Sequence, residues 1–317
     1  MQAVVIEGGR LRWRERPDPV PGPDEIVVRV AAAGLNGADI MQAAGHYPPP
    51  PGVPADQPGL ELAGVVEQVG DAVRSFVPGD AVMALMAGAA QAELAVVHAG
   101  HALAVPQGMT MQEAGGFPEA YCTAHDALFT QARLGMGERV LVTGAAGGVG
   151  TAAVQLAVAA GASVVASARD EGGHAALAAL GAEPAAPAQA LAMGPFDVVL
   201  ELVGAPGLPG ALGSLARWGR VVLIGASAGA RCEIDVSVMM QRRAALRAST
   251  LRNRTLEEKA GVVQALGHHV LSLVSRGRVK VAVDATYPFD EPQDAYDHFS
   301  RGGKFGKVVL VAQGGRA

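Results

Sequence analysis

The sequence contains little cysteine, few aromatic residues and no excess of basic charge. Its two cysteines, Cys122 and Cys232, can form neither a disulfide framework nor a cysteine-rich zinc cluster, and they fit a reducing compartment. Lysine and arginine number 25 against 30 acidic residues, a net charge of −5, which argues against nucleic-acid binding as the main role. The N-terminal MQAVVIEGGRLRWRERP lacks the apolar core of a signal peptide, and no apolar run approaches the ~20 residues of a membrane span. We therefore expect a soluble, cytoplasmic protein with neither nucleic-acid nor membrane partners.

The chain of 317 residues is long enough for two domains with separate cores. Its first part consists of short β segments separated by turns rich in glycine and proline. From Met111 the pattern becomes helical, and after Glu138 apolar strands alternate with helices, as in VLVTG, SVVASA, DVVLELVG and RVVLIG. This alternation predicts an α/β domain with a parallel sheet covered on both faces. The segments LEEKAGVVQALGHHVLSLVSRG and GKVVLVA predict a long helix and a closing strand near the C-terminus.

A glycine-rich loop lies between an apolar strand and an alanine-rich helix in ERVLVTGAAGGVGTAAVQLAVAAG. At such a turn the first N–H groups of the helix have no helical partner and the positive end of the helix dipole is exposed, so a diphosphate can bind if no side chain intervenes. Ala145 replaces the first glycine of the usual G-x-G-x-x-G pattern, at a small cost if its φ is negative. The alternative is a turn made only for tight helix–sheet packing. We predict a dinucleotide-binding loop formed by Gly147, Gly148, Val149 and Gly150.

The loop sequence TGAAGGVG also matches the T-G-x-x-x-G-x-G turn of short-chain dehydrogenases. Those enzymes carry the turn near the N-terminus, whereas here it begins at Thr143. They also require Tyr-x-x-x-Lys, and none of the four tyrosines of this chain is followed by lysine at that spacing. The sequence is therefore not that of a short-chain dehydrogenase.

The residues after the second strand, SVVASA, bear on the choice of cofactor. An acidic residue there would hold the ribose 2′-hydroxyl of NAD, and an arginine would accommodate the 2′-phosphate of NADP. Arg169 comes first and Asp170 follows. We expect Arg169 to pair with the phosphate of NADPH, with NADH as the alternative, and both residues could also be solvated charges.

Ordered segments over nearly the whole chain carry a family resemblance: GLNGADIMQAAGHYPPPPG, PGLELAGVVEQVG, PGDAVMALMAGAAQAE, FPEAYCTAHDAL, GERVLVTGAAGGVGTAAVQLA, STLRNRTLEEK and FGKVVLV. With them the chain resembles the zinc-independent quinone oxidoreductase branch of the medium-chain dehydrogenase/reductase superfamily. It is most similar to the p53-inducible quinone oxidoreductase-like group and more distantly to zeta-crystallin. The resemblance implies a GroES-like β-rich catalytic domain built from both termini (1–115 and 255–317) and a Rossmann domain between them (116–254), with the active site at their junction. It also implies NADPH-linked reduction of quinones by a homodimer.

Two positions of this resemblance predict that the chain binds no metal. Zinc-dependent relatives carry cysteine near the position of Asn36 and Gly-His-Glu where this chain has Gly59, Leu60 and Glu61. The catalytic metal would therefore lose a thiolate and an imidazole ligand. Without a Lewis acid an alcohol is a poor hydride donor, whereas a quinone or conjugated enone is already electron-poor. We expect hydride transfer to such an acceptor.

The resemblance also suggests roles for particular residues. Asn36 and Tyr47 match the substrate side near the nicotinamide, although a turn asparagine and a packed loop aromatic are the structural alternatives. Residues matching the family's cofactor contacts are Thr123, Gly225, Ala226, Ser227, Leu251 and Arg252. Lys307 in GKVVL is expected to face either a phosphate of the cofactor or a carboxylate.

The chain departs from the family where the 2′-phosphate is bound. Relatives usually offer serine and lysine at the positions of Asp170 and Gly173. NADH therefore remains an alternative cofactor. Two other functions also remain open: a reductase of enoyl thioesters, and a non-catalytic cofactor-binding protein such as some zeta-crystallin relatives.

Other polar candidates carry weaker signals. The pairs His98/His101 and His268/His269 have no accompanying cysteine or carboxylate cluster, so we interpret them as turn or surface histidines. Cys122 has no neighbouring base or cation in sequence, which favours a buried structural thiol. Thr255 and Glu258 have the spacing of a helix-capping box.

Overall fold

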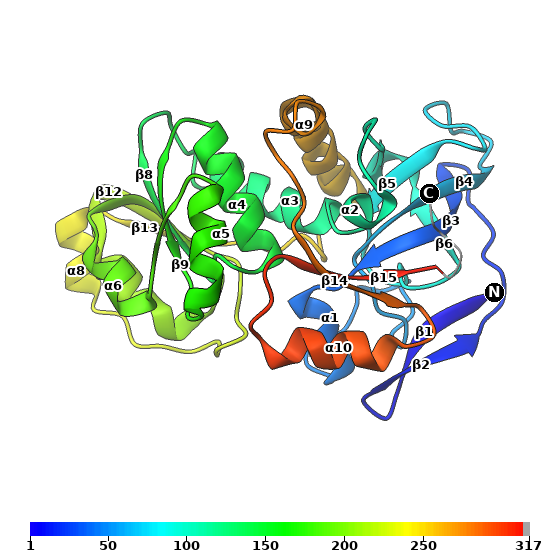
Figure 1. The fold of residues 1–317 in the computed structure, drawn as a ribbon, viewed down its shortest axis with the longest axis horizontal. Coiled ribbons are helices and arrows are strands. Elements are labelled where there is room, and N and C mark those ends of the chain that lie inside the picture. Colours follow the sequence, from blue (N-terminus) through cyan, green and yellow to red (C-terminus); the bar gives the residue numbers. More distant parts are fainter. Residues whose placement is uncertain (313–317) are drawn as a thin grey trace. The chain divides into compact units, whose positions relative to one another are not determined.

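The computed structural model describes residues 1–312 and divides the chain into two compact units (Figure 1). The terminal unit comprises Met1–Cys122 with Leu251–Ala317, and the central unit comprises Thr123–Thr250. The predicted boundaries at 115/116 and 254/255 lie a few residues away, and the first division falls inside α3 (Pro118–His125). Positions 313–317 of the predicted C-terminal segment lie outside the described residues.

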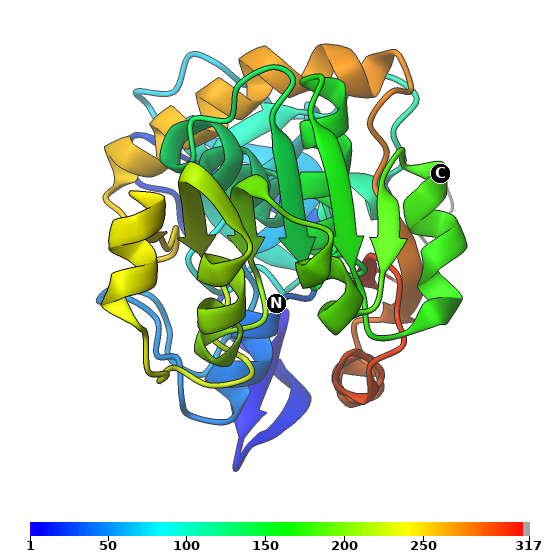
Figure 2. The same cartoon turned by 90° about the vertical axis from the view of Figure 1, so that its left-hand side faces the viewer.

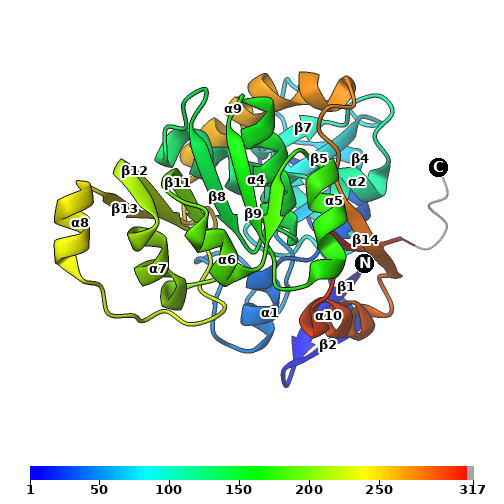
Figure 3. The ribbon, with the colours of Figure 1, turned by 60° about the vertical axis from the view of Figure 1, so that its left-hand side comes forward.

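The central unit is built on six parallel strands in the order β10–β9–β8–β11–β12–β13 (Figures 2 and 3). Along the chain they are β8 (Arg139–Thr143), β9 (Ser163–Ser167), β10 (Glu183–Ala185), β11 (Phe196–Glu201), β12 (Leu215–Leu223) and β13 (Ala245–Ala248). Numbered in chain order this is 3-2-1-4-5-6, the doubly wound arrangement that binds dinucleotides where the strand order reverses. That reversal lies between β8 and β11. The predicted α/β Rossmann fold is confirmed.

Short helices connect these strands. They are α4 (Gly148–Ala159), α5 (His174–Ala179), α6 (Pro187–Ala192), α7 (Leu208–Gly213) and α8 (Val236–Arg242), with the 3-10 turns η3 (Glu171–Gly173) and η4 (Ala205–Gly207). The π-helical segment η2 (Asp126–Gln131) precedes β8. The sheet contributes Leu141, Phe196 and Val221 to one apolar cluster, which α6 and α7 complete. Alanine and leucine supply most of the helical side of this packing, as expected for helices lying close to a parallel sheet.

The terminal unit contains a mixed sheet assembled from both ends of the chain. Its strands are β3 (Glu25–Gly34), β4 (Glu61–Val69), β5 (Ala81–Leu85), β6 (Leu94–His98), β7 (Ala102–Ala104), β14 (Val283–Pro288) and β15 (Lys307–Val311). β15 pairs antiparallel with the end of β3, with Val309 opposite Gly34, so the C-terminal strand extends a sheet begun near the N-terminus (Figure 1). This is the GroES-like part of the predicted fold.

A hairpin and helices complete this unit. They are β1 (Gln2–Glu7), β2 (Arg10–Glu15), α1 (Gly37–Ala43), η1 (Ala99–His101), α2 (Met111–Gly115), α9 (Leu256–Ser275) and α10 (Pro292–Arg301). α9 and β15 are the predicted long helix and closing strand, and Thr255 with Glu258 forms the predicted capping box at the start of α9. Among residues 1–312 no helix is both long and apolar enough to cross a membrane.

Candidate functional site

The loop after β8 makes its tight turn at Gly144, which precedes the substituted glycine position. Gly144 has a φ of +61°, in the left-handed region where a Cβ is unfavourable. Ala145 is not among the residues with positive φ, it is buried, and its N–H donates to Ser167 O on the neighbouring strand at 3.0 Å. The missing first glycine therefore costs little, because the residue before it takes the demanding conformation.

The two glycines at the start of α4 have different structural roles. A Cβ on Gly150 would lie 2.5 Å from Gly144 O, so this glycine is needed for contact between helix and loop. A Cβ on Gly147 would meet nothing closer than 3.5 Å. The contacts of residues 1–312 therefore do not require glycine at position 147.

Gly147 is the N-cap of α4 and has no side chain to accept hydrogen bonds from the first turn. The first helical N–H groups, those of Gly148, Val149 and Gly150, have no partner within the helix. They lie at the carboxyl end of β8, beside the point where the strand order reverses. The loop thus fits a diphosphate, the group that such a helix start binds.

Arg169 follows β9 at the same edge of the sheet. Parallel pairing places Ser167 opposite Thr143, so the segments after both strands leave the sheet together. Arg169 is exposed and forms no hydrogen bond or ion pair with residues 1–312. Asp170 instead caps the turn η3, its Oδ1 accepting the Gly172 N–H at 2.9 Å. The arginine is therefore available for an anion, while the carboxylate already has a local role.

The segment after β12 lies against the loop after β11. A Cβ on Gly225 would lie 1.9 Å from Leu202 O, so only glycine fits this close approach. Ser227 is exposed and its hydroxyl donates to Val203 O at 3.1 Å. Thr123, the remaining predicted contact in the central unit, is buried in α3. Ala226 is exposed beside Ser227 at the carboxyl edge of the sheet.

In the terminal unit, Asn36, Glu61 and Lys307 form a buried cluster. The Lys307 ammonium donates to Leu35 O and to Asn36 Oδ1, each at 2.7 Å, and lies 2.5 Å from Glu61 Oε1. Asn36 Nδ2 donates to Glu61 Oε1 at 2.9 Å, and the other carboxylate oxygen accepts the backbone N–H of Glu119 at 2.9 Å. Of the two partners expected for Lys307, phosphate or carboxylate, the structure provides the carboxylate.

This cluster forms because three chain segments meet at the sheet. Asn36 caps α1 just after β3, Glu61 begins β4 and Lys307 begins β15, and both β4 and β15 pair with β3. Glu61 is fully buried and Lys307 is 3% exposed. A buried charge needs a partner and hydrogen bonds, and each member of this pair has both.

A second buried acid, Asp39, lies one helical turn after Asn36. Its carboxylate accepts the backbone N–H of Asn36 at 2.8 Å and that of Gly59 at 2.9 Å. Burial raises the pKa of Asp39 to about 6, although these hydrogen bonds and the charges of Lys307 and Arg252 act to lower it. The residue holds the start of α1 against the segment that precedes β4.

Arg252 was expected at the cofactor, and its contacts lie within the terminal unit. Nε donates to Ala87 O at 2.8 Å, Nη1 to Tyr47 O at 2.9 Å and Nη2 to Gln42 Oε1 at 2.5 Å. The guanidinium also lies over the Tyr47 ring, 5.1 Å from its centroid. Burial lowers the pKa of Arg252, partly offset by Asp39. Arg252 thus fixes the loop that carries Tyr47, and the neighbouring Leu251 is buried.

Sequence reasoning missed Asp39 and Gln42 as members of this site. The spacing Asn36-x-x-Asp39 is that of a capping pair and could have indicated the first of them. Nothing in the sequence indicates that Gln42 meets Arg252, because the two are distant along the chain. Tyr47, the aromatic residue of this site, is half-buried.

The fold bears on two of the weaker candidates. Cys122 is buried, as predicted for a structural thiol. Within residues 1–312, no three His, Cys, Asp or Glu residues form a group that could hold a metal ion. The histidine pairs considered above, His98 with His101 and His268 with His269, belong to no such group.

A doubly wound sheet with a glycine loop, in one chain with a GroES-like β unit, defines an oxidoreductase of the dehydrogenase/reductase type. Residues 22–153 match the family described as alcohol dehydrogenase GroES-like domain, and residues 172–310 match the family described as zinc-binding dehydrogenase. The chain is 30% identical to the quinone oxidoreductase of Mus musculus over 92% of this chain and 91% of that protein. It therefore belongs to the medium-chain dehydrogenase/reductase superfamily, among the homologues of quinone oxidoreductase.

Two solved structures share the fold over nearly the whole chain. The mycobacterial protein Rv1454c complexed with NADPH is 25% identical, with a TM-score of 0.87 over 98% of this chain and 100% of that one. The CurK enoyl reductase is 25% identical, with a TM-score of 0.83 over 98% of this chain and 99% of that one.

Proposed function

We propose that this chain is a zinc-independent, NADPH-dependent reductase of quinones or conjugated enones, with NADH as the alternative cofactor. The observation that carries the proposal is the donor set around Glu61. Asn36 and Leu60 stand where zinc-dependent relatives have ligands, and the charge of Glu61 is balanced by the Lys307 ammonium. An amide, a leucine and a lysine-paired carboxylate do not form a zinc site. A hydride acceptor that needs no Lewis acid, such as a quinone or a conjugated enone, therefore suits these residues best.

The central unit fits a nicotinamide dinucleotide. The first-turn N–H groups of α4 would hold the diphosphate, and Arg169 would hold the 2′-phosphate. We propose Thr123, Gly225, Ala226, Ser227 and Leu251 as contacts of the nicotinamide half. Bound NAD(P)H supplies a hydride from C4 of its nicotinamide ring.

The terminal unit supplies the groups that act on the acceptor. We propose that Tyr47 orients the carbonyl or the flat ring of the substrate, held in place by Arg252. We propose that the Asn36 amide stabilises the oxyanion that develops as the acceptor is reduced, using the Nδ2 hydrogen whose present bond, to Gly34 O, is long at 3.4 Å. Lys307 and Glu61 fix the orientation of this amide. The proton that completes the reduction comes from water or from Tyr47. Lys307 and Arg252 are thus assigned positioning roles.

Steady-state oxidation of NADPH and NADH with 1,4-benzoquinone, 9,10-phenanthrenequinone and crotonyl-CoA tests the proposal. We expect turnover with the quinones and a lower KM for NADPH than for NADH. Turnover of crotonyl-CoA alone would overturn the assignment in favour of an enoyl-thioester reductase, the function that the likeness to the CurK enoyl reductase supports. Tight NADPH binding without any turnover would indicate a non-catalytic cofactor-binding protein.

We also propose that the protein is a cytoplasmic homodimer that pairs through β13. Within residues 1–312 this strand is an edge of the central sheet and pairs with β12 alone. Three large apolar side chains on β12 and α8 are exposed near it: Trp218 (64%), Val236 (62%) and Met240 (74%). Exposed apolar groups beside an open edge favour association. Light scattering of the purified protein would show a dimer, and Trp218→Glu with Met240→Glu would shift it to monomer.

A further inference from the structure

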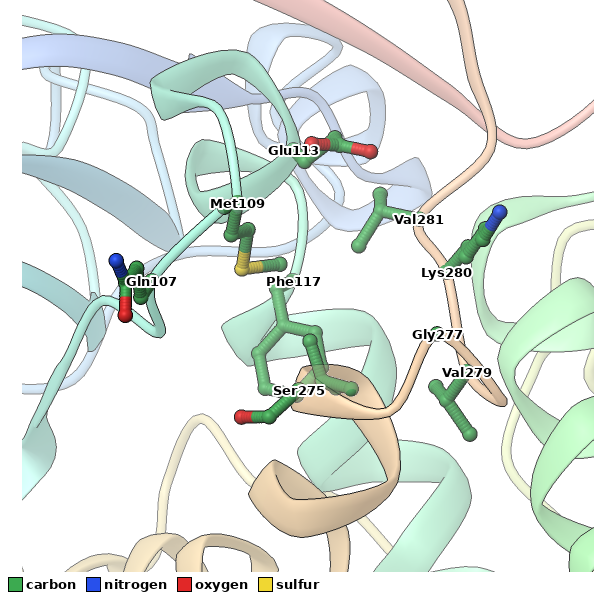
Figure 4. A pocket seen from close by; sticks show the side chains of 11 residues that line it. Gln107, Met109, Glu113, Phe117, Ser275, Gly277, Val279, Lys280 and Val281 are labelled. Carbon is green, nitrogen blue, oxygen red and sulfur yellow. The ribbon is translucent and has the colours of Figure 1, made fainter.

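Two cavities of the terminal unit lie outside the cluster of Asn36, Glu61 and Lys307. The smaller measures about 340 Å³ and is lined by the segments around Met109, Phe117 and Val279 (Figure 4). Its only acid, Glu113, is already bonded to Thr110 at the start of α2. The other polar side chains that line it, those of Gln107, Ser275 and Lys280, are exposed to solvent, so no buried polar group is aimed at a ligand there.

The larger cavity measures about 440 Å³, within the range of small-molecule sites. Apolar lining comes from Val53, Val96 and Leu256. The same cavity is lined by His98 and Lys259. Asn36 and Tyr47 are not among its lining residues, so the cavity is separate from the substrate groups proposed above.

Lys259 is the unusual residue of this cavity. It is 4% exposed, and within residues 1–312 its ammonium forms no hydrogen bond and no ion pair; only its backbone N–H is bonded, to Thr255 O at 3.1 Å. It belongs to the buried face of α9, followed at helical spacing by Val263, Leu266 and Val270. Lysines are almost never this buried unless they are paired. An ammonium on an apolar helix face therefore needs an explanation outside the protein's own contacts.

Neighbouring charges do not supply that explanation. Burial lowers the pKa of Lys259; the nearby carboxylate of Glu119 acts to raise it, and Arg252 acts to lower it. Glu119 is too distant to form an ion pair with Lys259. Glu257, whose charge acts on both histidines, is exposed to solvent, where its field is screened. Glu25, which lines the cavity opposite His98, has its carboxylate bonded to the Gly22 N–H at 2.7 Å.

The two histidines add donors beside the lysine. His98 Nδ1 accepts the N–H of Gly100 at 3.1 Å, so the proton of the neutral ring is on Nε2. His101 Nε2 lies 2.9 Å from Leu256 O, and the two rings are 4.9 Å apart. Leu256 and Lys259 both lie in the first turns of α9, where the helix dipole favours negative charge.

We propose that this cavity binds a small organic anion, with its carboxylate or phosphate head on Lys259 Nζ and His98 Nε2 and its apolar body over Val53, Val96 and Leu256. The unpaired buried ammonium selects for charge, and the apolar lining selects against inorganic ions. Because Ala87 lines the same cavity and its carbonyl accepts from Arg252, the bound anion would contact the segment that Arg252 joins to Tyr47.

Isothermal titration of the full chain with hexanoate, phenyl phosphate and hexanol tests the proposal. We expect saturable binding of at least one anion at concentrations up to about 10 mM and none of hexanol. Binding of hexanoate alone identifies a carboxylate site, and binding of phenyl phosphate alone a phosphate-ester site. Equal binding of hexanol, or no saturable binding of either anion, would overturn it.

Two variants locate the binding. Lys259→Met should weaken the anion about tenfold or more and should fold, because it removes an unpaired buried charge. His98→Asn keeps an acceptor for the Gly100 N–H and removes the Nε2 donor, so it should weaken the anion as well. The matched control is Lys280→Met, which alters a lysine of the smaller cavity and should leave affinity unchanged. Unchanged affinity in both Lys259→Met and His98→Asn would place the anion elsewhere and contradict the proposal.

Discussion

The Lys307 ammonium and the Glu61 carboxylate form an ion pair from which water is excluded, the two side chains being 4% and 0% exposed. Glu61 opens one strand and Lys307 another, so the pair joins the N-terminal and C-terminal segments of the terminal unit. The Asn36 amide bridges both ions. The position of this amide therefore depends on the pair.

Replacing Lys307 by methionine should destabilise the protein by about 3–5 kcal/mol, because Glu61 would remain charged and buried without its partner. The double variant Lys307→Met with Glu61→Gln should recover a large part of that loss. Urea denaturation measures both. The control is Arg29→Met, which breaks the exposed Arg29–Glu67 pair and should cost about 0–1 kcal/mol. A loss for Lys307→Met no larger than for this control would mean that the pair does not hold the cluster.

A variant of Arg252 tests whether this residue positions Tyr47 or binds the cofactor. Arg252→Met should lower kcat/KM for the quinone by about tenfold or more, because Tyr47 loses both a hydrogen bond and its cationic neighbour. The dissociation constant of NADPH, measured by fluorescence titration, should stay the same. Tyr47→Phe, which keeps the ring over the guanidinium, tests the hydroxyl alone. Weakened NADPH binding in Arg252→Met would restore the role that the family resemblance suggested.

The strand–helix alternation and the glycine loop predicted the central fold because both are local patterns. They predicted four of the six strands, and the two edge strands, β10 and β13, escaped prediction. β10 (Glu183–Ala185) contains proline and is very short, and β13 (Ala245–Ala248) follows a polar segment without apolar alternation. Short edge strands of this kind are fixed by their neighbours and not by their own residues.

The candidate site was less predictable because its contacts are long-range. The loop residues Gly147–Gly150 are adjacent in sequence and were found from it. The bond from Arg252 to Gln42 and the pair of Lys307 with Glu61 join distant segments, and residue type alone allowed either a phosphate or a carboxylate for the lysine. Only the pairing of β15 with β3 decides between them.

Arg169 should determine the preference between cofactors. Arg169→Ala should raise the KM for NADPH about tenfold and leave that for NADH little changed, because only the former carries the 2′-phosphate. Initial rates with each cofactor at a fixed quinone concentration measure this. Arg278→Ala, a change at an exposed arginine of the other unit, serves as the control. Equal effects of Arg169→Ala on both cofactors would remove Arg169 from the phosphate site.

Asp39 should make stability depend on pH. Its pKa is raised from 3.8 to about 6, so the folded state binds this proton more tightly than the unfolded state does. The stability that this group contributes is therefore greatest below about pH 4, falls as pH rises to about 6 and is constant above, a change of about 3 kcal/mol. Urea midpoints of the native chain and Asp39→Asn, compared between pH 4 and 7, measure the difference. Parallel profiles for the two proteins would contradict the raised pKa.

Variants of Gly147 and Gly150 should separate the effect of the loop on folding from its effect on cofactor binding. Gly150→Ala places a Cβ 2.5 Å from Gly144 O and should cost about 1–3 kcal/mol of stability. Gly147→Ala meets no protein atom within 3.4 Å, so stability should hold while NADPH binds at least tenfold more weakly, since the new methyl group occupies the space left for the diphosphate. Thermal unfolding without cofactor and fluorescence titration with NADPH measure the two effects. If Gly147→Ala binds NADPH as tightly as the native chain, the loop does not hold the diphosphate at its N-cap, and the cofactor assignment of the central unit loses its main support.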